Sequence, residues 1–242
     1  MDDIIVRILA LSKRLAEVPT DDAHHGAVQA QLAFANQIFE GIGSVCEKGN
    51  GLSGETLLRT LFEAVSGAII LAKHPEKLGD FIEHGRMTEL RMMRVIESPP
   101  LKERLEATLK ATEAEFQRLW AKFNENRWHG LGTKASFADA EFEPSVYDRY
   151  YRRASAIAHG QPYVTVRHGQ VRARPTAWKN LSFGARNMAM LMMVTLLVIL
   201  NREFKLGVDD DLAHLRRDVD ARLQQHMGEI LNVADANKNA TA

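Results

Sequence analysis

Apolar residues recur with a period of about 3.6 along almost the whole chain of 242 residues, and this pattern restricts the fold more than any other feature. In the segment 3–18, for example, Ile4, Ile8, Leu11 and Leu15 lie on one helical face. Glycine (16) and proline (7) together make up less than a tenth of the chain, which leaves few positions for turns. The sequence therefore predicts a few long α-helices rather than many short strands.

Proline, glycine and asparagine interrupt the helical pattern at intervals. We predict helices over residues 3–18, 22–48, 53–73, 76–97, 101–126, 144–160, 177–204 and 210–233. No period is sustained over residues 127–143, which predicts a loop with a short turn. In the run YVTVRHGQVRAR, β-branched and basic residues alternate around a His-Gly pair, which is typical of a hairpin. The predicted fold class is all-α, a helical bundle with a small β-hairpin insertion near residues 163–174.

No shift in composition marks a linker, so we interpret the chain as one helical domain with an N-terminal addition. Residues 1–50 are predicted to form a helical extension packed on the bundle, and residues 51–236 the bundle itself. The polar end, residues 237–242, is predicted to be a disordered tail.

A single cysteine, Cys46, excludes a disulfide within the chain and favours a reducing compartment, so we predict a cytoplasmic protein. Its apolar neighbours indicate an inert core residue. The most apolar run, Met188 to Leu200, has 13 residues, whereas a bilayer span needs about 20. We therefore predict a buried core helix there and no membrane partner.

Lysine and arginine (31) balance aspartate and glutamate (31) over the whole chain. Between residues 146 and 186, however, eight cations face one acid, Asp148, a local charge of +7. These cations are Arg149, Arg152, Arg153, Arg167, Arg172, Arg174, Lys179 and Arg186. Such a surplus is typical of a surface that binds a polyanion. The alternative is a solvated edge whose charges prevent strand addition.

The strongest candidate site lies on the predicted helix 144–160. Asp148, Arg152, Ser155 and His159 are spaced by 4, 3 and 4 residues and share one face, with Tyr151 on an adjoining stripe. An arginine can hold phosphate oxygens while a histidine at the last turn of a helix transfers a proton. The alternative is a histidine that only complements the helix dipole and an arginine that pairs with Asp148.

Two further clusters are candidates. Arg59 and Glu63 share a face of the otherwise apolar helix 53–73, so they must pair with each other or border a cleft. Trp128, beside Arg127 and His129, can stack on a base or instead plug the core next to a loop. No phosphate-binding glycine loop, zinc-protease motif or paired cysteine occurs, and we predict neither a metal site nor a cofactor.

The run RRASAIAHG resembles the Arg-x(4–6)-His motif of HEPN domains, all-α bundles that include many metal-independent ribonuclease toxins and anti-phage effectors. More closely, LLRTLFEAVSGAIILAKHPEKLGDF followed by YRRASAIAHG resembles a bacterial helical family of unknown function. That family pairs an early R-x-L-F-E helix with a late Y-x-x-x-S-x-x-x-H-G helix, and the likeness covers residues 57–160 and the helix after them.

The HEPN resemblance implies an endoribonuclease that acts on RNA as a homodimer, with an antitoxin or another regulatory partner. It implies His159 and Arg152 as catalytic residues, because Arg152 lies on the face of His159 and Arg153 does not. Where the HEPN motif commonly has a polar residue after the arginine, this chain has Arg153 or Ala154. Supporting residues are predicted to be Arg59, Glu63, Ser155, Tyr151 and Arg153, and nucleic-acid-binding residues Arg149, Arg167, Arg172, Arg174 and Trp128.

Two other interpretations stay open. In the first, the protein is a non-catalytic scaffold, with a buried hydrogen-bond network from Arg59 to His159 and an exposed methionine-rich interface at residues 188–193. In the second, the basic segment binds RNA without turnover.

Overall fold

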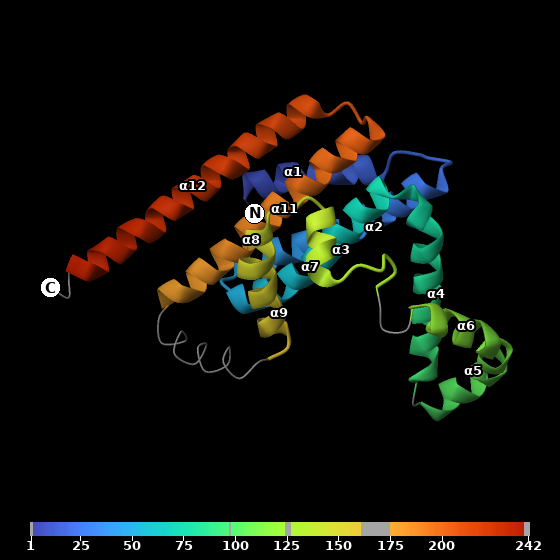
Figure 1. Cartoon of the computed structure of the whole chain (residues 1–242). Coiled ribbons are helices and arrows are strands. Elements are labelled where there is room, and N and C mark those ends of the chain that lie inside the picture. Colours follow the sequence, from blue (N-terminus) through green and yellow to red (C-terminus); the bar gives the residue numbers. More distant parts are fainter. Residues whose placement is uncertain (1, 97, 124–126, 161–174, 240–242) are drawn as a thin grey trace.

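The computed structural model describes residues 2–96, 98–123, 127–160 and 175–239, and helices account for most of these ranges (Figure 1). No strand occurs in the described part of the chain, so the all-α prediction is confirmed. The hairpin predicted at residues 163–174 lies outside the described residues. The helices are α1 (Asp3–Ala16), α2 (Ala23–Glu47), α3 (Gly51–Lys73), α4 (Leu78–Arg94), α5 (Pro99–Ala111), α6 (Glu113–Phe123), α7 (Thr133–Asp139), α8 (Pro144–Val146), α9 (Arg152–Ala158), α11 (Pro175–Phe204) and α12 (Asp209–Asn239).

Helix α3 is the centre of the bundle and packs mainly against α2 and α11. From Leu58 to Leu71 its apolar side chains are almost all fully buried, and Phe62 contacts the ring of Phe137 on α7. Helices α1 and α2 supply Ile5, Phe39 and others to the same core. The N-terminal 50 residues thus build the interior of the bundle together with α3 and α11.

Helix α11 owes its apolar composition to its position between α2, α3 and α12. Met190, Met192 and Met193 are completely buried, so the prediction of a core helix is confirmed and the exposed methionine interface is wrong. The segment Asn180–Phe204 is long and apolar enough to span a membrane, but 67% of its most apolar window is buried inside the bundle.

Helices α4, α5 and α6, residues 78–123, form an arm that projects from the bundle (Figure 1). Met87, Leu90, Leu119 and Phe123 give the arm a small core of its own. The helix predicted over 101–126 is broken at Thr112, because α6 turns back onto α4. Ion pairs from α4 hold it there: Arg94 to Glu113 at 2.9 Å and Arg86 to Glu115 at 3.3 Å.

The start of α3 lies so close to α11 that only glycine fits. A Cβ atom on Gly51 would lie 2.6 Å from the backbone nitrogen of Ser182 and 2.7 Å from the Cβ of Leu181. Backbone cannot move aside as a flexible side chain can, so the two helices would be forced apart.

We expect Gly51→Ala to lower the free energy of unfolding by about 1–3 kcal/mol, the usual cost of overpacking. Gly79→Ala is the matched control, since a Cβ there meets no atom within 4 Å and alanine favours the helix by up to about 1 kcal/mol. Urea titration measures both. Equal stability of the two variants would contradict this packing.

Candidate functional site

The predicted helix 144–160 is divided into α8, a π-helical turn at Tyr147–Tyr151, and α9. The rings of Tyr147 and Tyr151 stack with their centroids 5.5 Å apart, and both rings contact Phe137. A π turn adds a residue to one turn of helix and thereby rotates the residues after it about the helix axis. The turn therefore sets which side chains of α9 face α3 and which face water.

Two polar contacts fasten α9 to α3. The hydroxyl of Tyr151 donates a hydrogen bond of 2.9 Å to the Oε1 atom of Glu63. Arg153 donates from Nε to Oε2 of Glu55 at 3.2 Å, and from Nη2 to Oε1 of the same carboxylate. The Glu55 side chain is fully buried, and this burial raises its pKa although Arg153 opposes the rise. Arg153, which was predicted as a supporting residue, thus neutralises a buried acid.

Glu63 joins three parts of the chain. Besides Tyr151 it binds Arg127, from the connection that leaves the arm, at 3.1 Å. The third neighbour is Arg59, one turn earlier on α3, with its Nη2 atom 3.5 Å away. The side chains of Arg59, Glu63 and Arg127 are each about one third exposed. The predicted Arg59–Glu63 pair is present, as part of a larger cluster.

Arg152 and His159 point toward water. The Arg152 side chain is 69% exposed, and its one ion pair among the described residues is a loose contact of 3.7 Å with Asp148. His159 is exposed at the end of α9, where Gly160 leaves the helix with a φ of 59°. Seven residues apart, the two side chains share a helical face two turns apart. Arg149 is also exposed, in the preceding turn.

The buried network that the scaffold interpretation requires is only partly formed. Arg59, Glu63 and Tyr151 are in contact, but no hydrogen bond links the side chains of Ser155 or His159 to them within the described residues. Ser155 is half-buried and His159 is exposed. Within the described residues, the exposed His159 at the end of α9 therefore stands outside this network.

Trp128 is half-buried and packs edge-on against Phe81 of α4, with the ring centroids 5.2 Å apart. This contact agrees with the alternative in which Trp128 packs against the core next to a loop, here where the arm meets the bundle. The adjacent His129 is buried, and burial together with Arg127 and Lys77 lowers its pKa to about 4. His129 is therefore neutral near pH 7. Arg167, Arg172 and Arg174, predicted to bind nucleic acid, lie outside the described residues.

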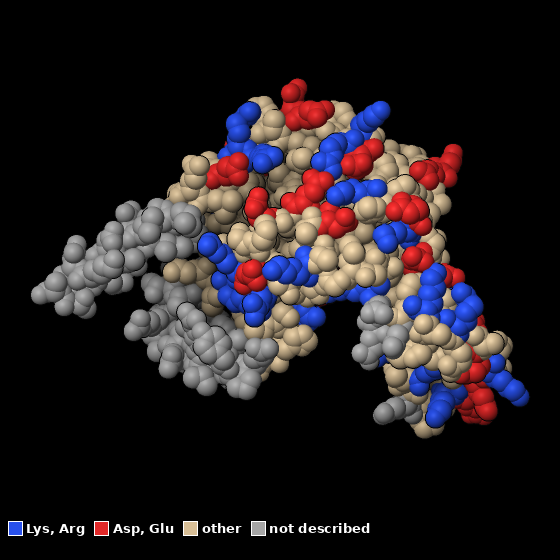
Figure 2. Space-filling view, in the orientation of Figure 1, with Lys and Arg blue, Asp and Glu red and all other residues tan. Residues whose placement is uncertain are grey.

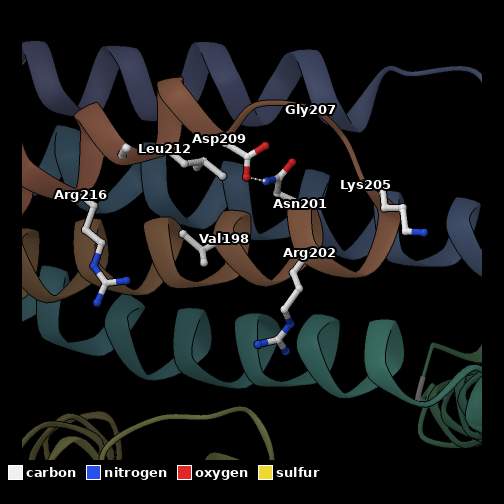
Figure 3. A pocket seen from close by; sticks show the side chains of 9 residues that line it. Val198, Asn201, Arg202, Lys205, Gly207, Asp209, Leu212 and Arg216 are labelled. Atoms are coloured by element: carbon white, nitrogen blue, oxygen red, sulfur yellow. Dashed lines mark hydrogen bonds between the residues drawn. The ribbon is translucent and has the colours of Figure 1, made fainter.

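A groove of about 570 Å³ lies away from α9, between the end of α11 and the start of α12 (Figure 3). Its polar groups are largely paired: Asn201 donates to Asp209 at 2.8 Å, and Arg202 binds Glu141 through two bonds. None of the predicted site residues lines this groove.

A family model described as a family of unknown function (DUF5677) matches residues 25–172, from α2 through α9. The chain belongs to this family. The predicted membership in a family of unknown function is therefore confirmed. The matched residues include Arg152 and His159 as well as the two pairs that hold α9 on α3, Tyr151 with Glu63 and Arg153 with Glu55. The HEPN relationship stays a prediction. Neither the curated proteins nor the solved structures contain a match to the chain.

Sequence reasoning missed Glu55 and the role of Arg127. Glu55, Arg59 and Glu63 are spaced by four residues each, a charged stripe on a helix that is apolar elsewhere. The two acids and one arginine of that stripe indicate that another element must supply a cation to neutralise the remaining carboxylate. Which cations would meet it was not visible, because Arg153 and Arg127 lie 98 and 64 residues from their partners.

We expect Arg153→Met to lower the free energy of unfolding at pH 8 by about 2 kcal/mol, because it leaves the carboxylate of Glu55 buried without a partner. The loss should shrink toward pH 5. Burial raises the pKa of Glu55 and Arg153 lowers it, so the loss of Arg153 raises that pKa further. The folded variant therefore takes up a proton at a higher pH than the parent does, and it regains stability relative to the parent as the pH falls.

Arg152→Met is the control, since the exposed pair with Asp148 contributes less than about 0.5 kcal/mol. Urea titrations at pH 8 and pH 5 measure both variants. If Arg153→Met matches Arg152→Met at both pH values, the pair of Arg153 and Glu55 does not hold α9.

Proposed function

We propose that the protein is a metal-independent endoribonuclease of the HEPN kind. The observation that carries the proposal is the exposure of Arg152 and His159 on one face of α9, while Arg153 and Tyr151 hold the same helix on α3. The helix combines a fixed position with an exposed permanent cation and an exposed imidazole. These are the groups that phosphoryl transfer without a metal requires.

In the proposed reaction the guanidinium of Arg152 binds non-bridging oxygens of an RNA phosphate. The imidazole of His159 accepts the proton of the adjacent 2′-hydroxyl, and the 2′-oxygen attacks phosphorus. The bond to the 5′-oxygen breaks, and that oxygen takes up a proton from an imidazolium or from water. The products are a 2′,3′-cyclic phosphate and a 5′-hydroxyl, with no oxidant or cofactor required.

The anchors of α9 support this assignment because catalytic groups must keep their geometry to within about half an ångström. A short helix of seven residues has little intrinsic stability of its own. Bonds from Tyr151 to Glu63 and from Arg153 to Glu55 compensate for that on α3, the most buried helix of the bundle.

A second copy of the chain is part of the proposal. One imidazole can accept the 2′-hydroxyl proton, and an imidazolium from a second α9 can protonate the leaving oxygen. Arg149 and the basic segment that continues to Arg174 would retain the RNA strand. We place the enzyme in the cytoplasm, as a toxin or phage-defence effector restrained by an antitoxin or similar partner.

A scaffold without catalysis is the second candidate, and the cluster around Glu63 favours it. Tyr151, Arg127 and Arg59 all turn toward this one carboxylate, so three elements are joined by groups that have no need of a substrate. The two candidates differ in what they predict for His159, which a scaffold does not use. RNA binding without turnover is a third outcome, and it too leaves His159 without a role.

We expect the purified protein to cut single-stranded RNA in the presence of EDTA and to leave 2′,3′-cyclic phosphate ends. His159→Ala and Arg152→Ala should each lower the rate at least about 100-fold, the usual contribution of a group that moves a proton or stabilises the charge of the transition state. His214→Ala, which removes an exposed histidine from α12, is the matched control and should keep the parent rate.

Gel electrophoresis of end-labelled RNA measures the cleavage, and chemical analysis of the ends identifies the product. Equal rates for His159→Ala and His214→Ala would show that any cleavage comes from a contaminant or from another site. RNA that is bound but left intact by the parent protein would favour the module without turnover.

A further inference from the structure

The surface between α9 and the arm is hollowed. Figure 2 shows this hollow between the main body and the arm, with Lys or Arg side chains at its upper edge. The ribbon in Figure 1 places α9 on one side of it and the arm on the other. Arg127 belongs to the connection that leaves the arm, and it meets Tyr151, at the start of α9, on Glu63. The Glu63 cluster therefore lies where the arm and α9 come together on α3.

One flank of α9 leads from this cluster to His159. Tyr151, Ser155 and His159 succeed each other at intervals of four residues, so they form a shallow spiral along one side of the helix. With a rise of 1.5 Å per residue, the eight steps cover about 12 Å. Ser155, in the middle, is half-buried, and Arg153 faces the other way toward Glu55. The flank thus runs from the buried Tyr151, beside the Glu63 cluster, to the exposed His159.

Arg59 is the least satisfied cation in the cluster. A guanidinium has five N–H donors, yet the one ion pair of Arg59 among the described residues is the contact of 3.5 Å with Glu63. Its Nε atom is buried and has no hydrogen-bond acceptor within the described part of the chain. A buried donor without an acceptor is costly, so Glu63 does not fully satisfy this guanidinium. The Arg59 side chain is still 29% exposed, and an anion from solvent can approach it at that exposed part.

Arg186 and Arg222 also have a buried Nε atom without a hydrogen-bond acceptor in the described residues, and they serve as a comparison with a structural role. Both bind the carboxylate of Asp2, at 3.7 Å and 3.3 Å, and both lie over the ring of Phe183. Arg59 has no such aromatic contact within the described residues, and it shares its carboxylate with Arg127 and Tyr151. The two cations around Glu63 exceed its charge by one, which leaves the cluster positive.

We propose that Arg59 and Arg127 bind a backbone phosphate of the RNA strand, about two helical turns along α9 from His159. The inference rests on the proposed function, since it takes RNA as the ligand, and it changes the role of Arg59 from a support of α9 to a contact with the substrate. Glu63 limits the affinity of this subsite because its carboxylate competes with the phosphate for both arginines. The subsite reads no base and accepts any sequence.

The test uses the full chain and an oligoribonucleotide of mixed sequence with 2′-O-methyl groups, which cannot be cleaved through the 2′-oxygen. Its affinity is measured by fluorescence anisotropy at several salt concentrations. Each phosphate contact on a single strand contributes about 0.7 to the slope of log K against log salt. We expect Arg59→Gln to lower that slope by about 0.7 and to weaken binding about three- to tenfold. Arg104→Gln, an exposed arginine on α5, is the matched control and should keep the parent slope.

Glu63→Gln should change the RNA affinity in the opposite direction. This variant also tests the proposal if Arg59→Gln does not fold. The amide can still accept the hydroxyl of Tyr151 but no longer neutralises the arginines, so binding should tighten and the slope should rise. A merely structural cluster predicts the reverse, weaker binding through a loosened α9. Thermal unfolding monitored by circular dichroism identifies a variant that has lost its fold.

The outcomes separate the subsite from the ribonuclease. Suppose that cleavage depends on His159, that Arg59→Gln keeps the salt dependence of RNA binding seen in the parent, and that Glu63→Gln does not bind RNA more tightly. This result would overturn the phosphate subsite but not the proposed ribonuclease. If RNA binding shows the expected changes in salt dependence in both variants but the parent protein does not cleave RNA, the subsite is supported and the ribonuclease proposal is wrong. An oligonucleotide that does not bind at all would overturn the subsite.

Discussion

The neutralisation of charge on α3 is the constraint on which the rest of the structure depends. This helix occupies the middle of the core, yet it carries Glu55, Arg59 and Glu63 along one side. A carboxylate as deeply buried as that of Glu55 is tolerated only with a cation beside it. Arg153 supplies that cation, and it brings α9 with it. Arg127 binds Glu63, which is one third exposed and has Arg59 beside it, and this contact ties the connection from the arm to α3.

Because the same contacts satisfy α3 and position α9, stability and function are coupled in this fold. Tyr151 and the half-exposed Arg153 bind carboxylates of α3, whereas Arg152, between them in the sequence, is 69% exposed and pairs only loosely with Asp148. Successive residues of any helix diverge by about 100°, and the π turn before α9 sets which side each of them faces. Structural and candidate catalytic residues thus alternate along a single short segment.

Much of the fold was predictable because its signals are local. Helix ends depend on proline, glycine and capping residues, and the run of methionines in α11 is too apolar for a surface position. The shared face of Arg152 and His159 is also set by spacing alone. The break at Thr112 was not predictable, because a continuous charged pattern fits one helix or two, and contacts between α6 and α4 decide between them. The partners of Glu55 and Glu63 were hidden for the same reason.

By itself, the sequence determined that this chain forms a bundle of long helices, with a buried core helix around residues 188–200 and a late helix that carries an arginine and a histidine on one face. Periodicity and composition act over a few turns, so they are readable without coordinates. Only the tertiary structure decided that Arg153 serves α3 while Arg152 does not, that Arg59 shares Glu63 with two other residues, and that His159 is open to water. The contacts of Glu55 and Glu63 join side chains that are 64 to 98 residues apart in the sequence. The free energy of such contacts depends on burial in the folded protein and not on local spacing.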